Sequence, residues 1–200
     1  MHPDEAELWA LIERRCLPDA DAASIDALIW HRYGAERAIM YTDLSGFSRR
    51  SSEFGIIHFL EVIYESLRLF RPILASGGGR LVKTEADSLL VRFSTPSAAL
   101  DAAFAMQRAC VEFNLQRPPE EQVLLCVGLG YGPVLCIGDV DMYGEQVNAA
   151  SKLGEDTARA GEILVSDAFR AAMTSREGVA YEPIPAQVPG SIRNFRVLGR

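Results

Sequence analysis

The sequence predicts an α+β fold whose sheet is rich in antiparallel strands and carries its helices on one face. Three observations predict it. Apolar runs with strand character alternate with two long segments of helical periodicity, strand runs after the first helix come as a directly joined pair, and further strands follow toward the C-terminus. The resulting order β-α-β-β-α-β, with additional C-terminal strands, is that of the ferredoxin-like class.

The first predicted strand opens the stretch at residues 37–48, RAIMYTDLSGFS. Its apolar and β-branched residues are typical of a buried strand, and the run ends in one carboxylate, Asp43. Gly46 permits a tight turn that presents backbone N–H groups, and Ser48 is placed to cap a following helix, so a phosphate would fit beside the carboxylate with a metal ion between them. Taken alone, an aspartate at such a position is more often a structural turn residue.

The next predicted elements are a long helix and a hairpin. Residues 53–76 carry apolar side chains three or four apart, which predicts an amphipathic helix that ends at the glycines 77–79. Residues 80–93 predict two strands joined by a tight connection at 85–87. That connection places a second carboxylate, Asp87, at a turn of the predicted sheet.

A second long helix and a second hairpin are expected after this. Thr95 or Ser97 is expected to cap the helix, which runs through residue 110. Residues 123–137 predict two strands around a hairpin at Gly130-Tyr131-Gly132-Pro133. The remaining expected elements are a helix from about 145 to 157, a strand at 162–165, a short helix from 167, and strands near 179–183 and 192–198.

Residues 1–35 predict an N-terminal helical extension that precedes one domain over residues 36–200. The extension has two apolar helical faces separated by the break LPDAD. We expect these faces to serve packing or dimer contact rather than regulation. Their residues are Leu8, Leu11 and Ile12 in the first helix and Ile25, Leu28 and Ile29 in the second.

Composition excludes several classes of partner and compartment. The formal net charge is −7 without a Lys/Arg block, which disfavours nucleic acid as a partner but is compatible with a nucleotide held through metal ions. No apolar run approaches the length of a membrane span, and the N-terminus is acidic where a signal peptide would be basic, so we expect a cytoplasmic protein with no membrane partner. The cysteines show no metal-binding spacing and are expected to be reduced and buried: Cys16, Cys110, Cys126 and Cys136.

Asp43 and Asp87 both lie at strand ends or turns of one predicted sheet. Neighbouring strands are close enough for two such carboxylates to share a cation. Oxygen-only ligands, without a Cys/His cluster, favour Mg²⁺ or Mn²⁺ over zinc. On these positions alone, two unrelated turn aspartates are an equal alternative.

From residue 37 to about residue 169 the chain resembles the catalytic domain of the class III nucleotidyl cyclases, the adenylate and guanylate cyclases. The stretch TDLSGFS resembles the first metal-aspartate motif of this family, and KTEAD with SLLVRF resembles the second. DMYGEQVNAASK resembles the loop and helix that carry the base-selecting and transition-state residues. These motifs occur in the expected order and spacing.

The resemblance implies that Asp43 and Asp87 bind two Mg²⁺ or Mn²⁺ ions. One ion would help to activate the ribose 3′-hydroxyl, while the other holds the β and γ phosphates. It also implies that the turn after the first strand gives N–H groups to the triphosphate. The residues of that turn are Leu44, Ser45, Gly46, Phe47 and Ser48.

The same resemblance implies a choice of base. Lys83 occupies the place where adenylate cyclases have Lys and guanylate cyclases have Glu, and Asp141 occupies the place of the second base-reading residue. Lys donates to adenine N1 and a carboxylate accepts from the 6-amino group, so the pair implies an adenylate cyclase that converts ATP to 3′,5′-cyclic AMP and pyrophosphate. The alternatives are GTP or a pyrimidine nucleotide as substrate, or a cyclase-like module that binds nucleotide or a partner with little or no turnover.

Asn148 resembles the residue that orients the ribose in this family, whereas Lys152 stands where adenylate cyclases usually carry Arg. Lys keeps the charge that stabilises the α-phosphate in the transition state but loses the planar bidentate fork. Glu85 and Ala86 also depart from the family, which has an apolar residue and Gly there. Arg193 is the nearest candidate for a basic residue that grips the triphosphate.

In this family the site forms at a dimer interface, with the metal aspartates from one subunit and the base-reading and transition-state residues from the other. The resemblance therefore implies a two-fold homodimer with two equivalent, shared sites.

Overall fold

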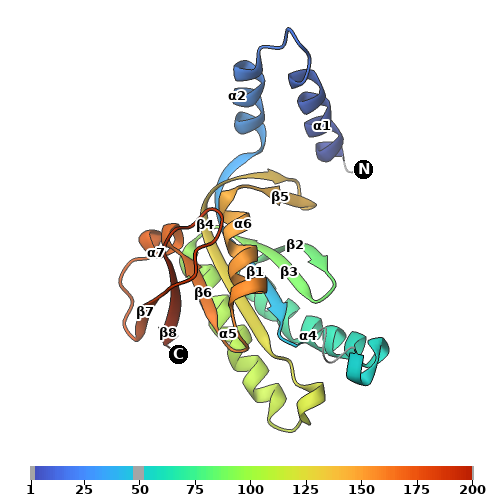
Figure 1. Ribbon diagram of the computed structural model, residues 1–200, viewed down its shortest axis with the longest axis vertical. Helices are drawn as coiled ribbons and strands as arrows, with labels where there is room; N and C mark the ends of the chain where they lie inside the picture. The colour runs from blue at the N-terminus through green and yellow to red at the C-terminus, as the bar shows by residue number, and fades with distance from the viewer. Residues whose placement is uncertain (1–2, 47–51, 200) are drawn as a thin grey trace.

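The computed structural model describes residues 3–46 and 52–199 of the chain, shown in Figure 1. The described residues form one eight-stranded sheet in the order β2-β3-β1-β4-β6-β8-β7, with β5 paired to β4. The strands are β1 (Gly34–Leu44), β2 (Arg80–Glu85), β3 (Ser88–Phe93), β4 (Leu125–Ile137), β5 (Asp141–Tyr143), β6 (Ile163–Ser166), β7 (Val179–Ile184) and β8 (Asn194–Gly199). The helices are α1 (Pro3–Arg15), α2 (Ala22–Tyr33), α4 (Ile56–Ser76), α5 (Pro96–Asn114), α6 (Glu145–Ser151) and α7 (Asp167–Ala172), with the 3₁₀ turn η1 (Pro119–Glu121) and the π-helical segment η2 (Lys152–Thr157).

The predicted α+β fold is confirmed. The first four strands in the sheet order, β2-β3-β1-β4, pair antiparallel and are connected through α4 and α5 in the expected β-α-β-β-α-β sequence. The pairing of β4 with β6 is parallel. Thr95 caps α5 by accepting a hydrogen bond from the Ala98 N–H at 3.2 Å, as one of the two predicted caps.

Helices cover both faces of the sheet, so the expectation of one covered face is wrong. On one face α4 and α5 pack Phe59 and Leu100 against a core that includes Met40 of β1. On the other face α6 packs Val147 against Ile39 of β1. The central residues of β1, from 38 to 42, are buried on both sides, which a two-sided cover requires. In Figure 1, α6 lies in front of β1 and β4, with α4 and α5 behind.

The hairpin predicted within residues 123–137 is also wrong, because β4 runs straight through it and pairs with β1 along eleven residues. The glycines there serve helix packing rather than a turn. A Cβ at Gly128 would overlap the Ala150 carbonyl oxygen of α6, and a Cβ at Gly130 would overlap that of Gln146. Pro133 lies in a stretch of β4 that pairs with β1 alone, so the ladder tolerates its missing N–H.

The helix predicted from about 145 to 157 begins as expected but is not α-helical throughout. Regular α-helix ends at Ser151, and the backbone continues as the π-helical segment η2. Gly154 lets this segment touch β1, because a Cβ there would lie 2.6 Å from the Tyr41 carbonyl oxygen. A wide π turn thus lies directly over the strand that carries Asp43.

Some predicted apolar positions face solvent. Leu28 is 40% exposed, and Ile56 and Leu60 are about half exposed, although their neighbours on the same helices are buried. Figure 1 shows why for α4, since its first turns extend beyond the edge of the sheet. The cysteines among the described residues are free, and Cys110 and Cys126 are buried as expected, but Cys16 is exposed and Cys136 is only partly buried.

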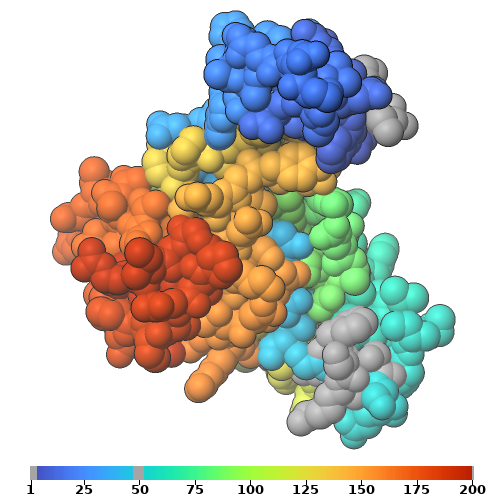
Figure 2. Space-filling view, turned by 45° about the horizontal axis from the view of Figure 1, so that its top comes forward, coloured from blue at the N-terminus to red at the C-terminus, as the bar shows by residue number. Residues whose placement is uncertain are grey.

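The two N-terminal helices pack on the rim of the sheet. Their buried face, which includes Leu11 and Ile29, forms a small core with Ile137 at the end of β4. Figure 2 shows this pair, in blue, at one end of the molecule. The chain passes from α2 into β1 without a loop, because α2 ends at Tyr33 and β1 begins at Gly34. In the part of the chain that the structure describes, no helix has the length and apolar character to cross a membrane.

The contact between β4 and α6 predicts that Gly128→Ala destabilises the fold. The added methyl group would meet the backbone of Ala150 and Gly154, which cannot rotate away, so we expect a loss of about 1–3 kcal/mol in the free energy of unfolding. Urea denaturation followed by circular dichroism measures this. Glu36→Ala, at an exposed position of the neighbouring strand β1, is the control. A Gly128→Ala midpoint equal to that of the wild type would contradict the packing described.

Candidate functional site

Two carboxylates meet at the end of β1. Asp43 is the penultimate residue of this strand, and Asp87 lies in the turn between β2 and β3. The antiparallel register of β1 with β3 pairs Thr42 with Leu89, so the turn falls beside the strand end. The Ser88 hydroxyl lies 3.5 Å from Asp43 Oδ1 and donates to it. The structure therefore brings together the two residues predicted as metal ligands.

The carboxylates at this strand end repel one another when they are charged. Partial burial raises the pKa of Asp43 to about 6, and the negative charges of Asp87 and Glu155 add to the shift. Burial also raises the pKa of Asp87, although hydrogen bonds from the backbone N–H groups of Asp87 and Leu44 oppose that shift. A cation between the two carboxylates would remove the repulsion and restore the charged forms.

The donor set fits a divalent cation. Asp87 Oδ2 is buried and has no hydrogen-bond partner, which is the state expected of a ligand oxygen that faces an ion. Carboxylate oxygens are the ligands that Mg²⁺ and Mn²⁺ prefer. Within residues 3–46 and 52–199, no group of three or more His, Cys, Asp or Glu side chains is arranged to hold a metal. Two carboxylates, those of Asp43 and Asp87, would leave further coordination positions for substrate oxygens and water.

Glu155 is a third acid near this point that the sequence did not single out. Its Oε1 accepts from the Ser88 hydroxyl at 3.2 Å, and its Oε2 accepts from Ser151 at 2.6 Å. It comes from η2, and its approach depends on the contact between η2 and β1. The signal that could have found it is the glycine pair Gly128 and Gly154, which permits that contact.

The two predicted base-reading residues are also brought together, from strands far apart in the sequence. Lys83 of β2 places its Nζ 3.4 Å from Oδ2 of Asp141 in β5. The Met142 N–H donates to Asp141 Oδ1 at 2.8 Å and fixes that carboxylate. Lys83 also contacts Glu85, with Nζ to Oε1 at 2.7 Å. Sequence reasoning recorded Glu85 as a departure from the family pattern and missed this contact.

Three further predicted site residues face solvent. Asn148 of α6 and Lys152 at the start of η2 are exposed, and Lys152 Nζ lies 2.7 Å from Asp156 Oδ2. Arg193 is exposed in the loop before β8. That loop lies against α6, because Gln146 Nε2 donates to the Gly190 carbonyl oxygen at 2.9 Å.

The turn after β1 is described in part. Leu44 is buried, and the Ser45 N–H already donates to the Leu124 carbonyl oxygen at 2.8 Å. Gly46 is exposed with φ 90°, the left-handed conformation that a tight glycine turn adopts. Phe47 and Ser48, which were predicted to contribute further donors, lie outside the described residues.

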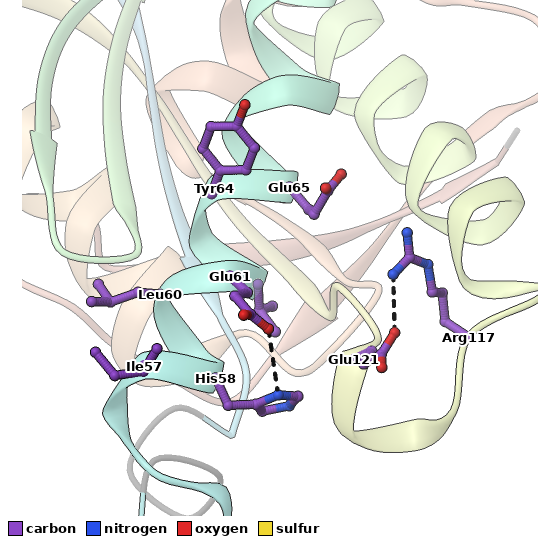
Figure 3. A pocket seen from close by; sticks show the side chains of 9 residues that line it. Ile57, His58, Leu60, Glu61, Tyr64, Glu65, Arg117 and Glu121 are labelled. Carbon is purple, nitrogen blue, oxygen red and sulfur yellow. Dashed lines mark hydrogen bonds and ion pairs between the residues drawn. The ribbon is translucent and has the colours of Figure 1, made fainter.

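A hollow of about 420 Å³ lies elsewhere, between the start of α4 and the loop after α5. Figure 3 shows its lining, in which His58 pairs with Glu61 and Arg117 pairs with Glu121. None of the predicted site residues lines it.

The chain was compared with known protein families and structures. The model of the adenylate and guanylate cyclase catalytic domain matches residues 32–191. A serine/threonine-protein kinase of Myxococcus xanthus is 31% identical over 76% of this chain, and an adenylate cyclase of Streptomyces coelicolor is 32% identical over 66%. The crystal structure of an adenylate/guanylate cyclase/hydrolase from Silicibacter pomeroyi covers 82% of this chain and is itself covered to 97%, with 27% identity and a TM-score of 0.70.

The chain spans a small part of those two relatives, 18% of the Myxococcus kinase and 32% of the Streptomyces cyclase. The similarity therefore belongs to one shared domain. The family model covers residues 32–191, which include Asp43 and Asp87, the pair Lys83 and Asp141, and α6. This chain belongs to the family of adenylate and guanylate cyclase catalytic domains, the class III nucleotidyl cyclases.

Proposed function

We propose that this chain is an adenylate cyclase domain that converts ATP to 3′,5′-cyclic AMP and pyrophosphate. One observation carries the proposal: two partly buried carboxylates of raised pKa meet at the end of β1, and one of them has an unpartnered buried oxygen. The choice of ATP rests on Lys83 and Asp141, which together present a donor and an acceptor that match adenine.

Asp43 and Asp87 would hold the divalent ions that this family generally uses. When bound, such ions supply Lewis-acid polarisation of the phosphate oxygens and ease the loss of the ribose 3′-hydroxyl proton. The carboxylates would fix where the triphosphate sits, and Gly46, an exposed residue of the turn after β1, would offer it a backbone N–H. Positioning and charge neutralisation are the main sources of rate in phosphoryl transfer.

The chain's other residues would orient and stabilise the substrate. Asn148, on the exposed side of α6, is suited to hydrogen-bond the ribose, and Lys152 is suited to neutralise charge on the α-phosphate. Lys152 must first leave Asp156, its partner one helical turn on. Both are exposed, and exchange between solvent-exposed partners of this kind costs little.

We further propose that the site is completed in a homodimer. Asn148, Lys152 and Arg193 face solvent in the single chain, whereas Asp43 and Asp87 are half-buried at the strand end. A two-fold pairing would bring the exposed set of one copy to the carboxylates of the other and create two equivalent sites.

The pairing of Lys152 with Asp156 favours a second candidate function. A cation held by its neighbour and lacking a guanidinium fork stabilises the transition state less well, which fits a cyclase-like module that binds nucleotide with weak turnover. GTP or a pyrimidine nucleotide as substrate is the alternative within the same reaction class.

The assay that tests the proposed function incubates the purified protein with Mn²⁺ and each of ATP, GTP, CTP and UTP, and separates the cyclic products by chromatography. We expect cyclic AMP from ATP. Asp87→Asn should lower kcat at least about 100-fold, because it weakens the hold on the metal ions. Asp101→Asn, an exposed aspartate of α5 paired with Arg176, is the control. No cyclic product from any nucleotide would overturn the enzyme proposal.

Asp43→Asn should stabilise the metal-free protein at pH 7.5. Because the pKa of Asp43 is raised to about 6 in the folded state, folding favours its protonated form. The free energy of unfolding therefore falls as pH rises from about 4 to about 6, and above that range the charged Asp43 carboxylate continues to destabilise the folded state. Asn carries no charge, so the variant should melt higher than the wild type at pH 7.5, and this gain should vanish near pH 4.

Added Mn²⁺ completes this test by differential scanning fluorimetry. Mn²⁺ should raise the melting temperature of the wild type and of Asp101→Asn, because a ligand that binds only the folded state stabilises it. It should have little effect on Asp43→Asn. Equal Mn²⁺ shifts in all three proteins would show that Asp43 does not hold the ion.

The shared site predicts complementation between inactive chains. Asp43→Ala and Asp141→Ala chains, mixed by co-expression, should recover about a quarter of wild-type activity, because half of the dimers are mixed and each mixed dimer has one intact site of two. Each variant alone should be nearly inactive. If the mixture forms dimers by size-exclusion chromatography but is no more active than either chain, the shared-site arrangement is wrong.

A further inference from the structure

Four side chains form a continuous run of polar contacts across the face of the sheet. The Tyr41 hydroxyl of β1 donates to Glu85 Oε2 at 3.1 Å. Glu85 Oε1 lies 2.7 Å from Lys83 Nζ, which lies 3.4 Å from Asp141 Oδ2. Tyr41 is buried in the rigid centre of β1, so the run is anchored at that end. The base-reading pair is therefore one part of a larger arrangement.

Lys83 is shared unequally between its two carboxylates. Lys83 Nζ lies 2.7 Å from Glu85 Oε1 and 3.4 Å from Asp141 Oδ2, so the contact with Glu85 is shorter by 0.7 Å. The hydrogen bond with Glu85 is also the largest cause of the raised pKa of Lys83. Glu85 thus takes the primary ion pair, and Asp141 keeps a weak one.

The Asp141 carboxylate has a fixed orientation and can still accept a hydrogen bond. Its Oδ1 accepts from the Met142 N–H at 2.8 Å, which sets the plane of the carboxylate. The hydrogen bond that Lys83 donates to its Oδ2 is long, at 3.4 Å, and the Tyr143 hydroxyl also interacts with this carboxylate. A carboxylate has about four acceptor sites, so Asp141 retains the capacity to accept another hydrogen bond. With one ammonium and two carboxylates, the three side chains carry a net charge of −1, which favours an incoming donor.

We propose that Glu85 is a specificity-determining positioning residue, which holds Lys83 so that Asp141 Oδ2 accepts a hydrogen bond from an exocyclic amino group of the base. The inference rests on the proposed function and deepens it. Adenine and cytosine present an amino group at the corresponding edge, whereas guanine and uracil present a carbonyl oxygen. Glu85 therefore selects nucleotides whose base carries its amino group at this edge, at C6 of a purine or C4 of a pyrimidine, and not guanine, whose amino group is at C2.

Glu85→Gln tests this selection. The neutral amide holds an ammonium less strongly, so Lys83 should close on Asp141 and occupy the oxygen that reads the amino group. We expect the ratio of kcat/KM for ATP to that for GTP to fall about tenfold. Glu182→Gln is a matched control, since Glu182 is 50% exposed and pairs with Arg196 at 2.9 Å, while Glu85 is 52% exposed.

A double-variant cycle separates positioning from a general structural effect. If Glu85 acts through Lys83, then Glu85→Gln should leave the ATP/GTP ratio unchanged in a Lys83→Met background. An equal loss of selectivity in both backgrounds would overturn the proposed route. An unchanged ratio for Glu85→Gln in the otherwise wild-type chain would overturn the proposal itself.

Binding of 3′-deoxy-ATP and 3′-deoxy-GTP, measured by calorimetry with Mn²⁺, gives a readout that does not need turnover, since these nucleotides lack the reacting hydroxyl. The wild type should prefer 3′-deoxy-ATP, and Glu85→Gln should narrow the preference. If the wild type shows this selective binding but forms no cyclic product, the cyclase proposal fails while the role of Glu85 stands. A wild type that forms product yet binds both analogues equally would overturn the role of Glu85 alone.

Discussion

The close backbone contact of α6 and η2 with β1 and β4 is the constraint on which the rest of the arrangement depends. Gly128, Gly130 and Gly154 leave no room for a Cβ between these elements. The segment η2, with Glu155, is thereby held over the strand end that carries Asp43. The same contact covers the second face of β1, so the strand is buried on both sides and cannot shift sideways.

Two groups of charged side chains on this face differ in how completely their charges are paired. At one end, burial raises the pKa of Asp43, and the negative charges of Asp87 and Glu155 raise it further. Farther along, Lys83 is paired with two carboxylates. Among the described residues, no cation forms an ion pair with the first group that would balance its charges, whereas the second group contains its own cation, Lys83. Groups that must bind an external ion are commonly left in this condition.

Local patterns in the sequence predicted much of the fold and part of the site. The strand, helix and hairpin that carry Asp43 and Asp87 depend on periodicity and turn residues, which are local signals. The prediction of a hairpin at Gly130-Tyr131-Gly132-Pro133 was wrong because this composition is typical of a turn. In the structure its glycines make room for Gln146 of helix α6, which is distant in the sequence. The contacts of Glu85 with Tyr41 and of Glu155 with Ser88 were not predicted, because each joins residues more than forty positions apart in the sequence and the second also depends on the π turn. Even Ala86, at φ 51°, adopts a conformation that sequence pattern predicts for glycine.

The direct passage from α2 into β1 has a mechanical consequence. Gly34 follows Tyr33 without a linker, and a side chain at Gly34 would strike the Trp30 carbonyl oxygen, so helix and strand are joined stiffly. The strand is hydrogen-bonded to β4 along its whole length and to β3 over residues 38–42, and this pairing makes it difficult to stretch or bend. A displacement of α1 and α2 would therefore shift β1 along its own axis. Asp43, about 30 Å away at the opposite end of the strand, would move with it.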